Sequence, residues 1–197
     1  ENIRASFKRL KSIGYDEVQT AGCRIPFEEF AAIAKDEGID IIGTHEDFDR
    51  MVNDFDEAVR IQQVLGARYM GVGGMGLMTE EKVNKFIVQA NEIGKKLIPY
   101  DMKFTFHHHA HEFIKYKDNT TYMDTLFEGL DKDTTSFCLD TYWIPNGGAD
   151  VRYWLEKLDG RVDILHLKDM KKLALDGQLR NTFFAAIGEG NMWWEGI

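Results

Sequence analysis

Short apolar runs alternate with longer segments of helical pattern along the whole chain. Six of these runs are typical of β-strands, and they begin near Glu17, Ile39, Tyr69, Lys103, Ser136 and Val162. Their starts lie about 29 residues apart on average, which is the length of one unit of strand, loop and helix. The pattern therefore predicts a sheet of parallel strands, each followed by a helix.

The segments between the apolar runs have the spacing of amphipathic helices. From Glu81 to Ile98 the apolar residues fall on one stripe, formed by Val83, Phe86, Ile87, Ala90, Ile93 and Leu97. Another helix is expected from Ile3 to Ile13, and Gly14, Gly38 and Gly66 stand where helices end in a left-handed residue. The fold class predicted from this alternation is α/β, a (β/α)8 barrel of the TIM type.

The length of the chain bears on the completeness of such a barrel. A full barrel takes about 250 residues, whereas this chain has 197. It opens in a helix without a preceding strand, and residues 192–197 have the pattern of a helix start without a following strand. We therefore expect residues 1–197 to be a single barrel domain that is a fragment lacking strands one and eight. A self-sufficient six-stranded domain is the alternative.

Composition and charge exclude some classes of partner. Apolar residues make up 44% of the chain and its formal net charge is −9. A nucleic-acid partner favours clustered Lys and Arg, whereas the lysines here are scattered. No apolar run approaches the roughly 20 residues that span a bilayer, and Cys23 and Cys138 are expected to be reduced thiols. These features predict a cytoplasmic protein without nucleic-acid or membrane partners, and leave a homo-oligomer open.

Three of the predicted strands are followed by side chains that bind metal ions. Glu112 is near the end of the run FTFHHHAHEF, Asp140 ends SFCLD, and His166 ends ILH. These residues are 28 and 26 positions apart, so parallel neighbouring strands would direct all three toward one point. A lone His or Asp after a strand is more often a helix cap or a satisfied polar group. Three in register predict a shared metal site.

This ligand set predicts a particular chemistry. Two carboxylates and one imidazole suit Mn²⁺, Mg²⁺, Co²⁺ or Zn²⁺, and differ from the thiolate cage of a structural zinc. Such an ion polarises a carbonyl and lowers the cost of removing a proton from the adjacent carbon. Glu112 is also the candidate general base, provided that burial raises its pKa. Lys168 shares a strand face with His166 and is placed to bind a hydroxyl or developing oxyanion; a surface pair with Asp169 is the alternative.

Other side chains are candidates for substrate contact. His107 and His109 share one strand face, and His45 ends another predicted strand, where a hydrogen-bonded filler is the equal alternative. Trp143 and Phe113 could form an apolar wall for a substrate ring, although aromatic residues between helices and strands more often belong to the core.

A glycine motif needs a separate interpretation. Gly71, Gly73 and Gly76 spell G-x-G-x-x-G between a strand and a helix, which is the outline of a dinucleotide-binding turn. Such a turn also requires an acidic residue at the end of the next strand, and that strand ends in histidines. We therefore interpret the glycines as a flexible loop lining the barrel mouth rather than as a site for NAD.

Four segments together resemble the sugar phosphate isomerase/epimerase family of xylose isomerase-like TIM barrels: HHHAHEF, LDTYWIPNGGAD, GRVDILHLKDM and AIGEGNMWW. The resemblance covers essentially the whole chain. It implies one divalent ion held by Glu, Asp, His and a second Glu, and it carries over directly to Asp140 and His166. Glu112 matches less closely, because the ligand of many relatives lies nearer the strand end, where this chain has His107.

The second Glu of the family falls on an eighth strand and is expected beyond Ile197. Glu189, in the segment IGEGN, is then expected to structure its loop or contact the substrate.

The resemblance implies a divalent-metal-dependent isomerase or epimerase of a sugar or related polyhydroxy carbonyl compound. A lyase on the same scaffold, either an inosose-type dehydratase or a 3-keto glycoside deglycosidase, begins with the same proton abstraction. A non-catalytic sugar-binding barrel is a further alternative, because fold does not decide function. A nuclease of the apurinic-endonuclease type would need several metal ions and a basic groove, which the charge of −9 disfavours.

Overall fold

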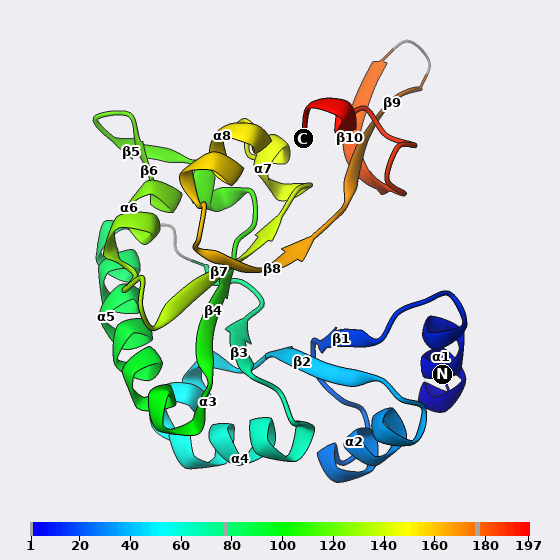
Figure 1. Cartoon of the computed structure of the whole chain (residues 1–197). Helices are drawn as coiled ribbons and strands as arrows, with labels where there is room; N and C mark the ends of the chain where they lie inside the picture. The colour runs from blue at the N-terminus through cyan, green and yellow to red at the C-terminus, as the bar shows by residue number, and fades with distance from the viewer. Residues whose placement is uncertain (1, 77–78, 176–177) are drawn as a thin grey trace. The chain divides into compact units, whose positions relative to one another are not determined.

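The computed structural model describes residues 2–76, 79–175 and 178–197, and its elements follow the predicted alternation (Figure 1). The main sheet contains, in spatial order, β1 (Glu17–Thr20), β2 (Asp40–His45), β3 (Tyr69–Val72), β4 (Lys103–His107), β7 (Thr135–Asp140) and β8 (Val162–His166). The pairs β1·β2, β2·β3 and β7·β8 are parallel. The predicted six strands are confirmed, each starting within one residue of the expected position.

Helices lie between most of the strands along the chain, and one precedes the first strand. They are α1 (Ile3–Ser12), α2 (Phe27–Asp36), α3 (Phe48–Asn53), α4 (Phe55–Leu65), α5 (Glu80–Leu97), α6 (Tyr122–Gly129), α7 (Trp143–Asn146) and α8 (Val151–Lys157). The predicted helix from Glu81 to Ile98 is confirmed as α5. Gly14, Gly38 and Gly66 have φ angles of 101°, 67° and 71°, which confirms the left-handed helix ends.

Several short elements depart from the predicted pattern. Within the described residues there are three 3₁₀ turns, η1 (Ile98–Tyr100), η2 (His111–Phe113) and η3 (Trp194–Gly196). Thus residues 192–197 contain a 3₁₀ turn where the start of a helix was predicted. Two antiparallel hairpins, which the sequence pattern did not predict, pair β5 (Lys115–Lys117) with β6 (Thr120–Thr121) and β9 (Asp169–Leu175) with β10 (Gln178–Ala185).

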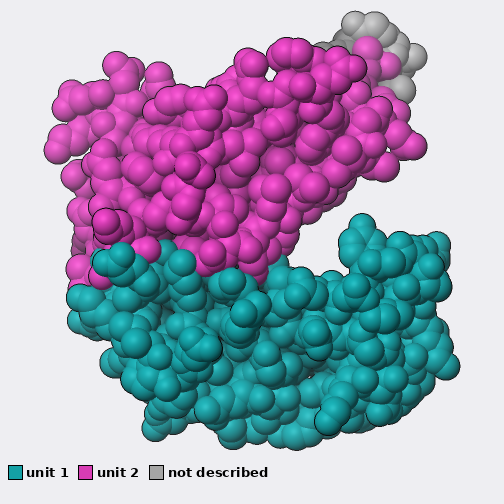
Figure 2. All heavy atoms as spheres, in the orientation of Figure 1, with its two compact units in different colours: residues 1–73, 89–105, 133–135 teal, residues 74–88, 106–132, 136–197 magenta. Residues whose placement is uncertain are grey.

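The chain packs into two compact units, which Figure 2 colours separately. Unit 1 comprises Glu1–Gly73, Gln89–Thr105 and Asp133–Thr135. Unit 2 comprises Gly74–Val88, Phe106–Lys132 and Ser136–Ile197. Both units are built from segments distant in sequence, and the expectation that residues 1–197 form one domain stays a prediction.

The core of unit 1 is formed by the apolar stripes of α1, α2 and α4 and by the residues around β2. Its buried members are Phe7, Phe30, Ala34, Ile39, Ile41, Ile61, Leu65 and Ala67. The rings of Phe7 and Phe30 meet edge to face with centroids 5.3 Å apart. Burying each such large side chain stabilises the fold by about 1.5–3 kcal/mol.

Close packing in unit 1 explains why two positions of the G-x-G-x-x-G motif, Gly71 and Gly73, are glycine. A Cβ on Gly71 would lie 2.3 Å from Thr105 Oγ1 and 2.9 Å from the carbonyl oxygen of Thr44. A Cβ on Gly73 would lie 2.8 Å from His45 Nδ1. Gly71 is part of β3, so its interpretation as part of a flexible loop is wrong. Close backbone approach explains why glycine occupies these two positions.

Unit 2 has a core of its own. Phe86, Phe106 and Phe137 are fully buried. The ring centroid of Phe106 lies 5.3 Å from that of Phe86 and 6.3 Å from that of Phe137. Helix α6 starts with a capping box, in which the side chains of Thr121 and Asp124 each accept a hydrogen bond from the other's backbone N–H. Among the residues that the structure describes, no helix has the length and apolar composition needed to cross a membrane.

Candidate functional site

Three side chains of unit 2 with metal-binding chemistry lie at the carboxyl ends of strands. His107 is the last residue of β4, Asp140 of β7 and His166 of β8. Asp140 and His166 stand directly opposite each other in the parallel register of β7 and β8. In α/β barrels the carboxyl ends of the strands carry the active site, so this is the face where chemistry is expected.

Asp140 is the centre of the group. Its carboxylate is completely buried, and Oδ1 accepts the backbone N–H of Tyr142 at 3.0 Å. Oδ2 lies 3.2 Å from His107 Nε2 and 3.5 Å from His166 Nδ1, and it accepts a hydrogen bond from Lys168 Nζ at 2.5 Å. Burial alone would raise the pKa of Asp140, but its bonds with His107, His166 and Lys168 outweigh burial and hold the pKa well below its usual range. The carboxylate is therefore ionised.

Thr141 fixes the end of β7 against the segment that follows β8. Its backbone N–H donates to the carbonyl of His166 at 3.1 Å, and its hydroxyl donates to the carbonyl of Lys168 at 2.8 Å. The backbone N–H of Lys168 donates back to the same hydroxyl at 2.9 Å. These bonds hold Asp140 in line with both His166 and Lys168.

His108 and His109 are kept neutral by their surroundings. Burial and the neighbouring His107 lower the pKa of His108 to about 3, and the same causes together with His111 lower the pKa of His109 to about 4. His108 Nε2 accepts the backbone N–H of Asp140 at 3.0 Å, which leaves its Nδ1 as the donor toward the carbonyl of His109 at 3.3 Å. His108 thus supports the backbone that carries Asp140.

Glu112 lies in η2, beyond the end of β4, and its carboxylate closes its own turn. Oε2 accepts the backbone N–H of His109 at 2.8 Å, and Oε1 is 3.0 Å from His111 Nε2. Burial raises the pKa of Glu112, as a general base requires. Within the described residues, the structure gathers the ligand atoms of His107, Asp140 and His166 within 4.8 Å of one another and does not bring Glu112 into that group.

Lys168 and Asp169 have separate partners. Lys168 pairs with Asp140, as described above, rather than with Asp169. The buried carboxylate of Asp169 accepts backbone N–H groups of Gly188 and Gly190 at 3.0 Å each, and the indole N–H of Trp194 at 2.8 Å. It also accepts the N–H groups of Met170 and Met192.

Asp169 therefore shapes the loop that carries Glu189, whose side chain is exposed. Burial alone would raise the pKa of Asp169, but these hydrogen bonds, led by the one from Trp194, lower it.

The remaining predicted residues lie in different surroundings. His109 is half-buried and packs against Trp143, the first residue of α7, with ring centroids 4.8 Å apart. Phe113 is buried against His108 and Trp154, so it belongs to the core and does not form a wall for a sugar ring. His45 ends β2 in unit 1, and its contact with substrate stays a prediction.

Two residues near the group were missed in the sequence. Cys138 Sγ lies 3.3 Å from His166 Nε2, and burial raises the pKa of this thiol to about 12, so it stays protonated. Its place two residues before Asp140 on β7 puts both side chains on one strand face, a clue that the sequence already held. Phe184 of β10 packs beside Trp143 and Tyr142 and could have been found only by predicting the hairpin. Both cysteines are free thiols, as expected.

The donor set fits a divalent ion. Ligand atoms of one four-coordinate ion lie roughly 3.4 Å apart, so small side-chain rotations would bring His107, Asp140 and His166 to bonding distance from their present spacing of up to 4.8 Å. Two imidazoles and one carboxylate suit a borderline metal ion. The ammonium of Lys168 on Asp140 Oδ2 shows that this carboxylate already attracts a cation.

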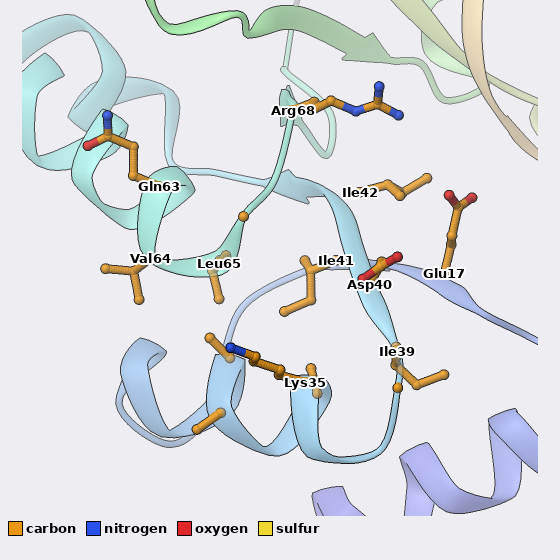
Figure 3. Close-up of a pocket in the computed structure, with 15 residues that line it drawn as sticks. Glu17, Lys35, Ile39, Asp40, Ile41, Ile42, Gln63, Val64, Leu65 and Arg68 are labelled. Atoms are coloured by element: carbon orange, nitrogen blue, oxygen red, sulfur yellow. The ribbon is translucent and has the colours of Figure 1, made fainter.

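A cavity with a volume of about 650 Å³ lies in unit 1 (Figure 3). Its charged lining residues are Glu17, Lys35, Asp40 and Arg68. Glu17 and Asp40 begin β1 and β2, so the cavity is at the amino ends of these strands. Barrel active sites lie at the opposite, carboxyl ends of the strands, so the candidate site is the group of His107, Asp140 and His166 rather than this cavity.

Comparisons with known proteins agree with the fold. A family model described as xylose isomerase-like TIM barrel matches residues 7–197. The alternating elements and the parallel strands define an α/β protein of the TIM-barrel class. The chain belongs to the xylose isomerase-like TIM barrel family. A comparison with curated proteins finds no match.

Solved structures with a similar fold include a sugar phosphate isomerase/epimerase from Parabacteroides distasonis, with 20% identity and a TM-score of 0.75 over 91% of this chain and 73% of that chain. The IOLI protein, solved with a zinc atom, has 14% identity and a TM-score of 0.72 over 96% and 76%. The probable 3-DHS dehydratase AsbF from Bacillus anthracis has 13% identity and a TM-score of 0.70 over 98% and 80%. At these identities the similarity shows the fold alone.

Proposed function

We propose that the protein is a divalent-metal-dependent isomerase or epimerase of a sugar or related polyhydroxy carbonyl compound. The observation that carries the proposal is the convergence of His107, Asp140 and His166 at the carboxyl ends of three strands. Similarity in fold to a sugar phosphate isomerase/epimerase and to a zinc-containing protein supports it.

His107, Asp140 and His166 would hold the ion. Two nitrogen ligands favour Zn²⁺, Co²⁺ or Mn²⁺ over Mg²⁺, which prefers oxygen. When bound, the ion would supply a Lewis acid that polarises the substrate carbonyl and makes the proton on the neighbouring carbon more acidic. The metal role predicted for Glu112 is not part of this proposal, because the structure groups His107 with Asp140 and His166 instead.

Two further residues would act on the substrate. Glu112 is our proposed general base and acid, because burial raises its pKa toward the working range of a proton shuttle. Lys168 would donate a hydrogen bond to the substrate oxygen on which negative charge develops, since its ammonium already lies at Asp140. His108 and Thr141 would hold Asp140 in place through its backbone and its neighbours.

A lyase is the second candidate function, and similarity in fold to the probable dehydratase AsbF favours keeping it. Isomerases, epimerases and these lyases share proton abstraction beside a carbonyl, so they differ only in the bond that changes next. A lyase must expel a hydroxyl or a glycosidic oxygen from the carbon next to the one that loses its proton.

Product analysis separates the two candidates. The protein loaded with Mn²⁺, Co²⁺ or Zn²⁺ would be incubated with ketoses, inososes and 3-keto glycosides, and the products would be followed by NMR. An epimer or an aldose–ketose pair selects the isomerase, and a dehydrated or deglycosylated product selects the lyase. Unchanged substrate throughout the panel, with metal binding demonstrated, would contradict both and leave the sugar-binding barrel.

A further inference from the structure

Phe184, on the β9·β10 hairpin, is an aromatic residue that contacts two other rings and is still largely exposed. Its ring meets that of Tyr142 at a centroid distance of 4.4 Å and that of Trp143 at 5.9 Å. It nevertheless remains 61% exposed. The two aromatic contacts set the orientation of the ring, and most of its surface is available to a ligand.

The hairpin positions this ring through Thr182, two residues earlier on the same face of β10. Thr182 Oγ1 lies 2.9 Å from the hydroxyl of Tyr142 and accepts a hydrogen bond from Asn146 Nδ2. Tyr142 and Asn146 flank α7, which begins at Trp143. The side chains of β10 are thus fixed to the segment that follows Asp140, rather than projecting freely from the hairpin.

Phe184 also lies close to the proposed metal ligands. Lys168 Nζ is 5.4 Å from the centroid of its ring and 2.5 Å from Asp140 Oδ2. The ring centre is therefore no farther from Asp140 Oδ2 than these two distances laid end to end. A substituent that projects from a sugar bound at Asp140 toward β10 would therefore reach Phe184.

We propose that Phe184, together with Trp143, forms a second subsite that binds a ring attached to the sugar that bears the carbonyl, so that the preferred ligands are keto glycosides or reducing disaccharides rather than free monosaccharides. The proposal rests on the function proposed above and narrows its substrate class. One face of a pyranose ring presents C–H bonds with partial positive charge, and the face of an aromatic ring carries partial negative charge. A phenyl aglycone would stack on the same surface.

The neighbouring Phe183 provides a matched control. It is also a phenylalanine, lies on the opposite face of the same strand, and is 47% exposed. Replacing it changes the hairpin's apolar surface without touching the proposed subsite. Thr182→Val supplies a second test, because it keeps the aromatic ring and removes the hydrogen bonds that orient the hairpin against Tyr142 and Asn146.

The test compares ligand binding in the Mn²⁺-loaded protein by calorimetry. The probes are D-glucose, D-galactose and D-mannose, their phenyl glycosides, which lack a free carbonyl and report binding alone, and cellobiose, whose reducing end keeps the carbonyl. We expect the glycosides to bind at least tenfold more tightly than the monosaccharides, and Phe184→Ala to remove about tenfold of that preference. Phe183→Ala should change every Kd by less than twofold, and Thr182→Val should reduce the glycoside preference to an intermediate value.

Equal affinity for glycosides and monosaccharides, or equal losses in Phe184→Ala and Phe183→Ala, would overturn the second subsite. Proton exchange catalysed on a monosaccharide, without any glycoside preference, would refute this subsite while the proposed function stands. A glycoside preference that depends on Phe184, without catalysed exchange on any substrate, would support the subsite and refute the proposed function.

Discussion

One carboxylate oxygen, Asp140 Oδ2, lies close to the imidazoles of His107 and His166 and to the ammonium of Lys168. The ammonium holds a position that a divalent ion would compete for. Metal binding must therefore displace Lys168 from Asp140, and this displacement costs part of the binding free energy.

Replacing Lys168 tests that competition. Lys168→Met should raise the affinity for Zn²⁺ or Mn²⁺ by roughly threefold to tenfold, because the competing charge pair is lost. Titration calorimetry at constant ionic strength measures the change. Lys171→Met removes a lysine from β9 and serves as the control for net charge. Weaker metal binding in Lys168→Met would mean that Lys168 supports the ion rather than competes with it.

Asp169 is the clearest structural residue near the site, since its buried carboxylate accepts five hydrogen bonds from the chain around it. Asp169→Asn would turn an NH₂ group toward backbone N–H donors. We expect the free energy of unfolding to fall by about 1–3 kcal/mol at pH 7, measured by urea denaturation. Asp159→Asn, at an exposed position, is the control and should change little.

The same variant has a pH dependence of known sign. The pKa of Asp169 is lower in the folded protein than the ordinary value of about 4. Its stabilising contribution is therefore complete above pH 4 and is lost as the pH falls below 4 toward the folded pKa. The difference between the wild type and Asp169→Asn should shrink between pH 4 and pH 3. A difference that stays constant over that range would show that the carboxylate charge contributes nothing.

At the scale of elements, the sequence predicted the strands well because each is a short apolar run bounded by polar or glycine positions. The β9·β10 hairpin was not predicted, although Asp176 and Gly177 separate its two strands in sequence, and an Asp-Gly pair is a hairpin indication. Its strands contain lysines, and apolar and polar residues alternate along them only in part. Because that composition resembles a polar loop, Phe184 and Thr182 were not predicted as site residues.

Strand spacing explains why the candidate site was predicted only in part. Spacing alone places residues at the same end of a sheet, which is where Asp140 and His166 lie. It does not decide which side chain within a few residues of a strand end reaches the common point. His107 ends β4, whereas Glu112 lies five residues later in a turn that its own carboxylate closes. Only the turn geometry distinguishes them.

Strand β3 depends on glycine. Gly71→Ala would bring a Cβ to 2.3 Å from Thr105 Oγ1 and 2.9 Å from a backbone oxygen, so the neighbouring strand residues would have to shift. We expect the free energy of unfolding to fall by about 1–3 kcal/mol. Gly76→Ala is the matched control, because nothing lies within 4 Å of its Cβ. Equal urea midpoints for the two variants would refute the close packing assigned to β3.

At the scale of the whole molecule, a metal ion that binds only the folded state must stabilise it. At a free metal concentration 100 times the Kd, the gain is about 2.7 kcal/mol. For a chain of this size that gain corresponds to a rise in Tm of roughly 5–10 °C. Thermal unfolding with Mn²⁺ or Zn²⁺ should show this rise in the wild type and little of it in Asp140→Asn. The same rise in both proteins would place the ion elsewhere.

The central claim is that the residues around Asp140 remove a proton from the carbon beside a substrate carbonyl with the help of a divalent ion. The most direct measurement is solvent exchange: NMR or mass spectrometry of ketoses, inososes and 3-keto glycosides incubated with the metal-loaded protein in D₂O. The account predicts deuterium at that carbon, its loss on chelation or in Asp140→Ala and His166→Ala, and its loss in Glu112→Gln with metal binding retained. Absence of exchange in every substrate, with the metal bound, would contradict it.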